Sequence, residues 1–130
     1  MLETDIIHEE NSNRDELYLI QKYEHFIEYF YPIAQNIPRK HGIFKEKTIE
    51  LIFEFVDLVY DAGKTNQISK LYLVDSCLSK LRFRVRFMSN AKRKHMTRQQ
   101  HKVCQAHLAE SGSILGSWIK KHKGTKKTQP

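Results

Sequence analysis

One apolar pattern, at residues 71–88, constrains this chain more than any other feature of its sequence. Apolar side chains follow one another at intervals of 3, 4, 3, 4 and 3 residues: Leu71, Val74, Leu78, Leu81, Val85 and Met88. This spacing is typical of the seam that a helix buries against other helices. No glycine or proline interrupts the chain between Gly63 and Gly112. The sequence therefore predicts a long helix that packs against further helices.

A competing pattern lies inside the same segment. Residues 80–87, "KLRFRVRF", alternate cationic and apolar side chains, which is typical of a half-buried strand. The helical seam passes through these residues without a break, so we favour the helix. On a helix, the alternation becomes two apolar stripes separated by cations. The outer stripe, on the side away from the seam, consists of Tyr72, Leu73, Phe83 and Phe87.

The outer stripe needs a cover, which is either a loop or terminus of the same chain or a second subunit. We favour a subunit interface, because segment 44–62 also carries more apolar surface than one partner can bury. Its polar side chains form an acidic stripe at helical spacing: Glu46, Glu50, Glu54, Asp57 and Asp61. These carboxylates are predicted to be a solvated or interface face rather than acid–base machinery.

The cations beside the stripes are candidate ligands for nucleic acid or a protein partner. They are Lys80, Arg82, Arg84, Arg86, Lys92, Arg93 and Lys94. For Arg82 and Arg86, salt bridges to a neighbouring subunit and contacts with nucleic acid both remain open. The "KRK" of residues 92–94 is expected at an exposed helix end and is the better phosphate candidate.

Three further helices are predicted, at residues 14–37, 44–62 and from Thr97 onward. Pro32 is expected to kink the first helix, and Gly63 to end the second. Thr97 and Gln100 have the spacing of a capping box, and Gly112 and Gly116 would admit a close neighbour. The predicted fold is an all-α, up-and-down antiparallel four-helix bundle over residues 14–121. Residues 1–13 are expected to form a flexible extension, and residues 122–130 a basic disordered tail.

Charge is divided unevenly along the chain, whose formal net charge is +7. Residues 1–63 contain 13 acidic and 6 basic side chains, whereas residues 64–130 contain 2 acidic and 16 basic ones. Such asymmetry predicts a polyanion-binding face built by the second half. The alternative is a solvated surface on which the two halves neutralise each other.

Several other functions are not expected. The sequence has no signal peptide and no apolar run long enough to span a membrane, so we expect a cytoplasmic protein. Cys77 and Cys104 are expected to be reduced and buried. His101, Cys104 and His107 do not share one helix face, and no phosphate loop or nucleophile motif occurs. We therefore predict no metal, no cofactor and no enzymatic activity.

Four segments together resemble a known family. They are "YPIAQNIPRKHG" (Tyr31–Gly42), "AGKTNQISKLY" (Ala62–Tyr72), "LRFRVRF" (Leu81–Phe87) and "ILGSWI" (Ile114–Ile119). They resemble Avd, the accessory variability determinant of diversity-generating retroelements, over about Leu17 to Lys121. This family is related to the four-helix-bundle proteins of ribosomal RNA intervening sequences. Arg82 and Arg86 match arginines of the family's corresponding stretch.

The resemblance implies a basic four-helix bundle that assembles into a homopentameric ring or barrel. It also implies a non-catalytic accessory protein that binds a reverse transcriptase, RNA and DNA, including template-repeat RNA and cDNA, in mutagenic retrohoming. An alternative is an oligomeric scaffold that binds protein partners only. A third interpretation is a bundle of the intervening-sequence type with no retroelement partner.

Overall fold

The chain consists of helices joined by short connections. The structure, a computed structural model, describes the backbone of residues 2–90 and 92–127, and the side chains of residues 14–90 and 92–124. Over the described backbone it contains no strand, one 3₁₀ helix, η1 (Arg39–His41), and four α-helices. These are α1 (Leu2–Gln35), α2 (Gly42–Thr65), α3 (Ile68–Met88) and α4 (Arg98–Lys127). The predicted all-α class is confirmed.

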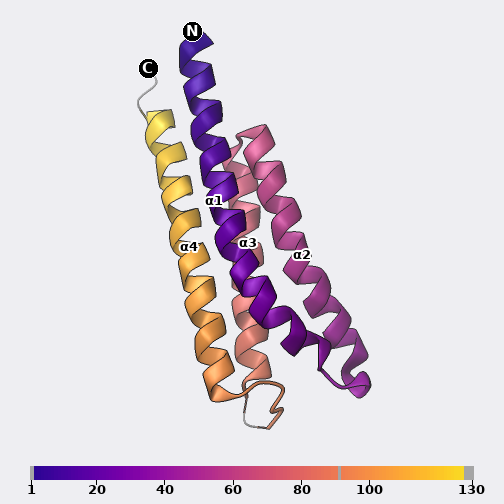
Figure 1. Ribbon diagram of the computed structural model, residues 1–130. Coiled ribbons are helices and arrows are strands. Elements are labelled where there is room, and N and C mark those ends of the chain that lie inside the picture. The colour runs from indigo at the N-terminus through magenta and orange to yellow at the C-terminus, as the bar shows by residue number, and fades with distance from the viewer. Residues whose placement is uncertain (1, 91, 128–130) are drawn as a thin grey trace.

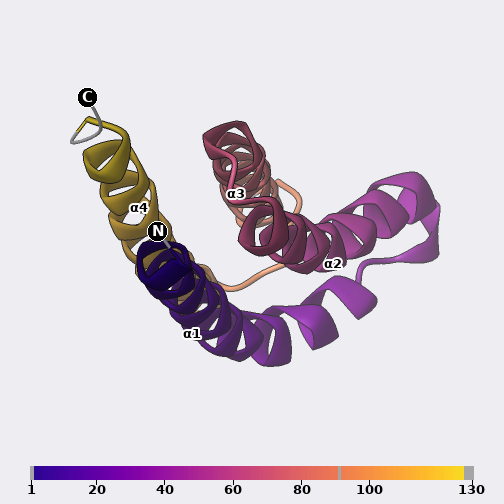
Figure 2. The ribbon, with the colours of Figure 1, turned by 90° about the horizontal axis from the view of Figure 1, so that it is seen from above.

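The four helices run alternately up and down (Figure 1). The α1–α2 and α3–α4 connections lie at one end of the molecule, and both termini lie at the other with the α2–α3 turn. Each helix packs against the next along the chain, and α1 also packs against α4. Figure 2 shows the same order of neighbours from above. This is the antiparallel four-helix bundle that the sequence predicts.

The seam of α3 faces the bundle core. All six of its apolar side chains are buried, and α3 continues through residues 80–87 as a helix. The helical interpretation is confirmed, because burying this seam outweighs the local preference of alternating residues for a strand. A hydrogen bond within the core joins α1 to α2, where the Tyr23 hydroxyl donates to the Ile52 carbonyl at 2.6 Å.

The first helix begins earlier than predicted. Its backbone is helical from Leu2 rather than from Arg14, and no glycine or proline stands before Pro32 to end it. Pro32 lies inside α1, and the last turns of α1 bend toward α2 in Figure 1. The side chains of the predicted N-terminal extension, residues 1–13, lie outside the described residues.

The second helix passes the glycine that was predicted to end it. It continues to Thr65, and Asn66 takes the left-handed cap position (φ 52°), with its N–H donating to the Ala62 carbonyl. Gly63 instead permits a close approach of α1, because a Cβ there would lie 2.5 Å from the carboxyl carbon of Glu16. Asparagine tolerates the left-handed region well enough to replace glycine as the cap.

The fourth helix extends beyond the predicted end of the bundle at Lys121. It begins with the predicted capping box, which is confirmed: the Thr97 N–H donates to Gln100 Oε1, and the Gln100 N–H donates to Thr97 Oγ1. Near its other end, Lys121 pairs with Asp15 at 3.2 Å. His122 Nε2 lies 2.9 Å from the Asn66 carbonyl oxygen. These contacts continue the bundle into the predicted tail; residues 128–130 lie outside the described part.

Candidate nucleic-acid and partner interface

The outer stripe of α3 is largely exposed in the single chain. Tyr72, Leu73 and Phe83 retain 45%, 48% and 52% of their accessible surface. Phe87 is half-buried, because its ring packs 5.1 Å from the ring of Phe44 on α2. The structure therefore places three side chains of the stripe in contact with solvent, while α2 covers part of the fourth.

Two of the candidate arginines are directed into the bundle. Arg84 donates from Nη1 to the Thr48 hydroxyl at 3.0 Å, and its guanidinium lies 5.1 Å from the Phe44 ring centroid. Burial lowers the pKa of Arg84. The guanidinium of Arg82 lies over Gly112 of α4, where a Cβ would be only 2.5 Å from Nη2. Both arginines therefore help to join helices, and neither is a fully exposed cation.

Gly112 and Gly116 differ in what approaches them. Gly112 accommodates the Arg82 side chain and, at 3.3 Å from a built Cβ, a methyl group of Leu78. Around Gly116 there is nothing within 4 Å of a built Cβ among the described residues. The predicted close approach thus involves side chains of α3 at one glycine.

The remaining candidate cations are exposed. Lys80 and Arg86 lie on the outer side of α3, and the Arg86 guanidinium is 5.9 Å from the Phe83 ring centroid. Lys92, Arg93 and Lys94 belong to the α3–α4 connection rather than to a helix end, because α3 ends at Met88. The Arg93 guanidinium covers the Phe87 ring at 3.7 Å.

Asn90 organises the connection that carries these three cations. Its carbonyl oxygen accepts the N–H groups of Arg93 (2.9 Å) and Lys94 (3.0 Å). Its side-chain oxygen accepts the N–H of Lys92 at 3.0 Å. The N–H of His95 then donates to the Met88 carbonyl at 3.2 Å and returns the chain toward α4. Asn90 therefore fixes the turn at residues 90–94, and the bond from His95 to Met88 closes the connection.

A second group of cations, in the α1–α2 connection, lies at the same end. η1 contributes Arg39, Lys40 and His41, and the His41 ring lies 5.1 Å from the ring of His95. We call this set the basic end: Arg39, Lys40, His41, Lys92, Arg93, Lys94 and His95. One feature of the sequence could have indicated the basic end: acidic residues are absent both from residues 29–45 and from residues 76–109.

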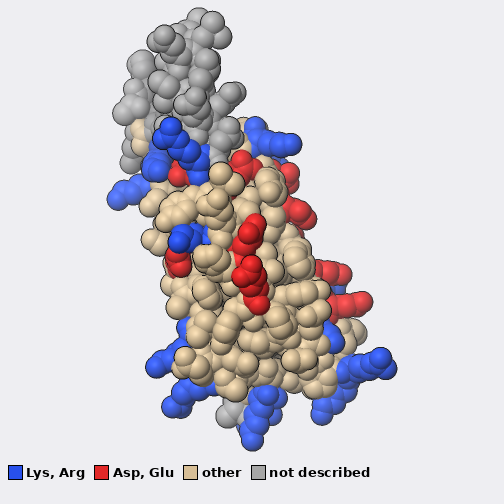
Figure 3. All heavy atoms as spheres, in the orientation of Figure 1, with Lys and Arg blue, Asp and Glu red and all other residues tan. Residues whose placement is uncertain are grey.

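The basic end is visible as a separate charged region. On the face drawn in Figure 3, Lys and Arg side chains gather at the lower end, whereas Asp and Glu lie farther up. A further basic group near the upper end stands beside acidic side chains. Burial lowers the pKa of His95, and the nearby His41, Arg93 and Lys40 lower it further. Like charge is thus concentrated enough at the basic end to affect titration.

The acidic stripe faces solvent along α2. All five of its carboxylates are exposed, as predicted for a solvated or interface face. The described ion pairs include one member of the stripe, Glu50, which is 3.7 Å from Lys47. The stripe thus leaves most of its carboxylates open to a cationic partner.

Three further features of the described residues concern the cysteines, the possible metal ligands and the apolar length of the helices. Cys77 and Cys104 are buried free thiols, and burial raises the pKa of each to about 12. In the described part of the chain, no group of three or more His, Cys, Asp or Glu side chains could hold a metal ion. No helix searched there is long and apolar enough to cross a membrane.

Comparison with known proteins gives one family. A search of curated proteins gives no match. The profile of a family described as "bAvd-like" matches residues 17–122, which is most of the chain. The match contains α2 and α3 whole and most of the lengths of α1 and α4. The chain therefore belongs to the bAvd-like family, that of the Avd proteins of diversity-generating retroelements.

Proposed function

We propose that this protein is a non-catalytic accessory protein that binds the reverse transcriptase of a diversity-generating retroelement together with nucleic acid. The nucleic acid is template-repeat RNA and the cDNA made from it, and the complex carries out mutagenic retrohoming. Membership of the bAvd-like family supports the accessory role.

The observation that carries the nucleic-acid part is the basic end. Two connections that are remote in sequence bring five lysines and arginines and two histidines together, and neither connection contains an acidic residue. Phosphates are recognised by such clusters of cations, whose affinity falls steeply with salt because counterions are released on binding. Lys80 and Arg86 extend the same charge along α3, whereas Arg82 and Arg84 serve mainly to join helices.

The proposed assembly is a homopentameric ring whose subunits meet at the outer stripe. Support comes from the exposure of Tyr72, Leu73 and Phe83, which a second copy would bury. The exposed acidic stripe of one subunit would lie opposite cations of the next. The number five rests on the family resemblance.

Light scattering after size exclusion tests the assembly. We expect a mass of five chains for the native protein and a smaller species for Phe83→Glu, because the charge would be placed in the interface. Leu17→Glu is the matched control, since Leu17 is exposed to a similar extent but lies on α1. A monomeric native protein would contradict the ring, and equal behaviour of both variants would exclude Phe83 from its interface.

Copurification with the reverse transcriptase tests the proposed protein partner. An RNA-binding measurement tests whether the protein also binds nucleic acid. The proposal requires both. Binding of the transcriptase without measurable affinity for RNA or DNA would favour the alternative, a scaffold that binds only proteins.

A further inference from the structure

Arg93 makes the closest contact between a cation and an aromatic ring among the described residues. Its guanidinium carbon lies 3.7 Å from the centroid of the Phe87 ring. The other contacts of this kind in the described part of the chain measure between 5.1 and 5.9 Å. A separation of 3.7 Å is van der Waals contact, so the guanidinium lies directly against the ring.

Phe87 is itself held by the bundle. Its ring lies 5.1 Å from the ring of Phe44 on α2, and the guanidinium of Arg84 lies 5.1 Å from the same Phe44 ring. Arg84 in turn donates to the buried hydroxyl of Thr48. A series of contacts therefore runs from the inside of the bundle to Arg93, and the ring beneath this arginine is fixed by the fold.

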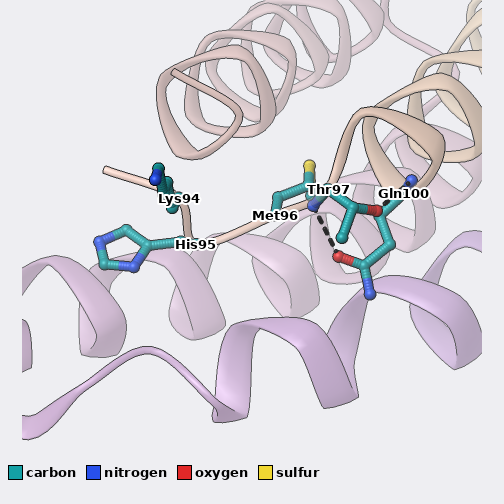
Figure 4. A pocket seen from close by; sticks show the side chains of 5 residues that line it. All are labelled: Lys94, His95, Met96, Thr97 and Gln100. Atoms are coloured by element: carbon teal, nitrogen blue, oxygen red, sulfur yellow. Dashed lines mark hydrogen bonds between the residues drawn. The ribbon is translucent and has the colours of Figure 1, made fainter. Parts of the chain in front are cut away.

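The backbone on both sides of Arg93 is also attached to the bundle. The N–H of Arg93 donates to the Asn90 carbonyl at 2.9 Å. Residues that line an open pocket follow Arg93 along the chain (Figure 4). Among them, Met96 is almost fully buried, and Thr97 and Gln100 close the capping box of α4. These attachments limit the movement of the connection that carries the guanidinium.

The Arg93 guanidinium is nevertheless available to a ligand. The residue is exposed, and its side chain forms no ion pair or hydrogen bond with any described residue. A guanidinium is planar, with N–H donors along its edge and a face on either side, and Phe87 occupies one face. The other face has the flat, delocalised character on which nucleobases stack. Lys92 and Lys94, which are both exposed, supply charge for the adjoining phosphates.

We infer that Arg93 and Phe87 form a stacking site for a nucleobase, in which an unpaired base lies on the guanidinium face opposite Phe87. The inference rests on the proposed function, and it names the form of nucleic acid that the basic end selects, which is a single strand. In a duplex the bases are stacked on one another, so their faces are not accessible to Arg93. Cations alone would not favour the single strand, because a duplex has the higher density of phosphates.

Arg93→Lys tests the stacking site, because lysine keeps the positive charge and loses the planar group. Fluorescence anisotropy with a labelled single-stranded RNA is expected to show a loss of affinity of about tenfold. The affinity for a duplex RNA of the same length should be retained, and so should the melting temperature of the protein. Arg98→Lys is the matched control, since Arg98 is exposed at the start of α4 and has no aromatic contact among the described residues.

Two further measurements separate stacking from a contact with phosphate. Phe87→Leu removes the ring that holds Arg93, so Arg93→Lys should cost little additional affinity in that background. An abasic strand keeps the phosphates without the bases, and Arg93→Lys should bind it as well as the native protein does.

Three results would overturn the stacking site while leaving the proposed function intact. They are equal affinities of Arg93→Lys and Arg98→Lys for the single strand, losses that add fully in the double variant, and an equal loss on the abasic strand. A native protein that binds no nucleic acid would overturn both.

Discussion

The buried Thr48 hydroxyl links two groups, one on α2 and one on α3. It donates to the Phe44 carbonyl at 2.7 Å and accepts from Nη1 of Arg84 at 3.0 Å, so it fixes an arginine of α3 against α2. The alternation of "KLRFRVRF" suggested an outward cation here. The structure instead gives Arg84 an acceptor inside the bundle, which the sequence pattern of one helix cannot reveal.

We expect Thr48→Val to lower the free energy of unfolding by about 1–3 kcal/mol, because it leaves the half-buried guanidinium without its acceptor. Thr65→Val is the matched control: its hydroxyl makes a similar bond to the Asp61 carbonyl at 2.9 Å, but on the surface. That variant should change the free energy of unfolding by less than about 0.5 kcal/mol. Urea unfolding measures both, and equal effects would show that the bond to Arg84 contributes nothing.

The lowered pKa of His95 predicts that the stability of the fold depends on pH. Its pKa is lowered in the folded protein by burial and by His41, Arg93 and Lys40, so the unfolded chain binds a proton more readily. The contribution of His95 to stability therefore falls as pH decreases from about 7.5 to about 5.5. We expect His95→Gln to reduce the fall in melting temperature across this range. Superimposable pH profiles for the two proteins would contradict this role.

At the scale of the helices, periodicity predicts most of the fold. The seam of α3, the capping box of α4 and the exposed stripe of α2 depend on spacing within one helix, and all three are confirmed. The helix end predicted at Gly63 was wrong, and α4 continues past Lys121, where contacts from other elements of the bundle are made. Glu16 approaches Gly63 from α1, and Lys121 and His122 contact residues far away in sequence.

The candidate site was predictable only in part, for the same reason. The sequence indicated Lys92–Lys94 as exposed cations. It did not indicate that η1 lies beside them. That proximity arises because the α1–α2 and α3–α4 connections lie at the same end of the bundle. It also did not distinguish exposed Arg86 from Arg82, whose position depends on the missing side chain of Gly112.

Two of the glycines of α4, Gly112 and Gly116, give a prediction at this scale. Gly116→Ala should raise the free energy of unfolding by about 0.5–1 kcal/mol, because alanine favours the helix and nothing described surrounds the new methyl group. Gly112→Ala has the same gain in helix propensity but must displace Arg82 and press on Leu78. We expect a smaller gain or a loss in urea unfolding. A larger gain for Gly112→Ala would contradict the packing of Arg82 over α4.

At the scale of the whole molecule, charge is separated along and around the bundle. The basic end occupies the two connections, whereas the acidic stripe follows the exposed side of α2. The basic end groups five lysines and arginines with no acidic side chain, so this part of the positive charge is presented by connections rather than by packed helices. If the chain assembles with its copies aligned, basic ends add together and binding of a polyanion becomes strongly dependent on salt.

The central claim is that nucleic acid binds at the basic end. RNA affinity measured against salt concentration tests it in the native protein and two triple variants. One variant removes exposed cations of the basic end (Arg39→Gln, Lys40→Gln and Lys92→Gln), and the other removes cations of the opposite end (Lys64→Gln, Lys70→Gln and Lys120→Gln). We predict a steep salt dependence for the native protein, a shallower one and weaker binding for the first variant, and little change for the second. Equal losses in both variants, or an affinity of the native protein that does not change with salt, would contradict the account.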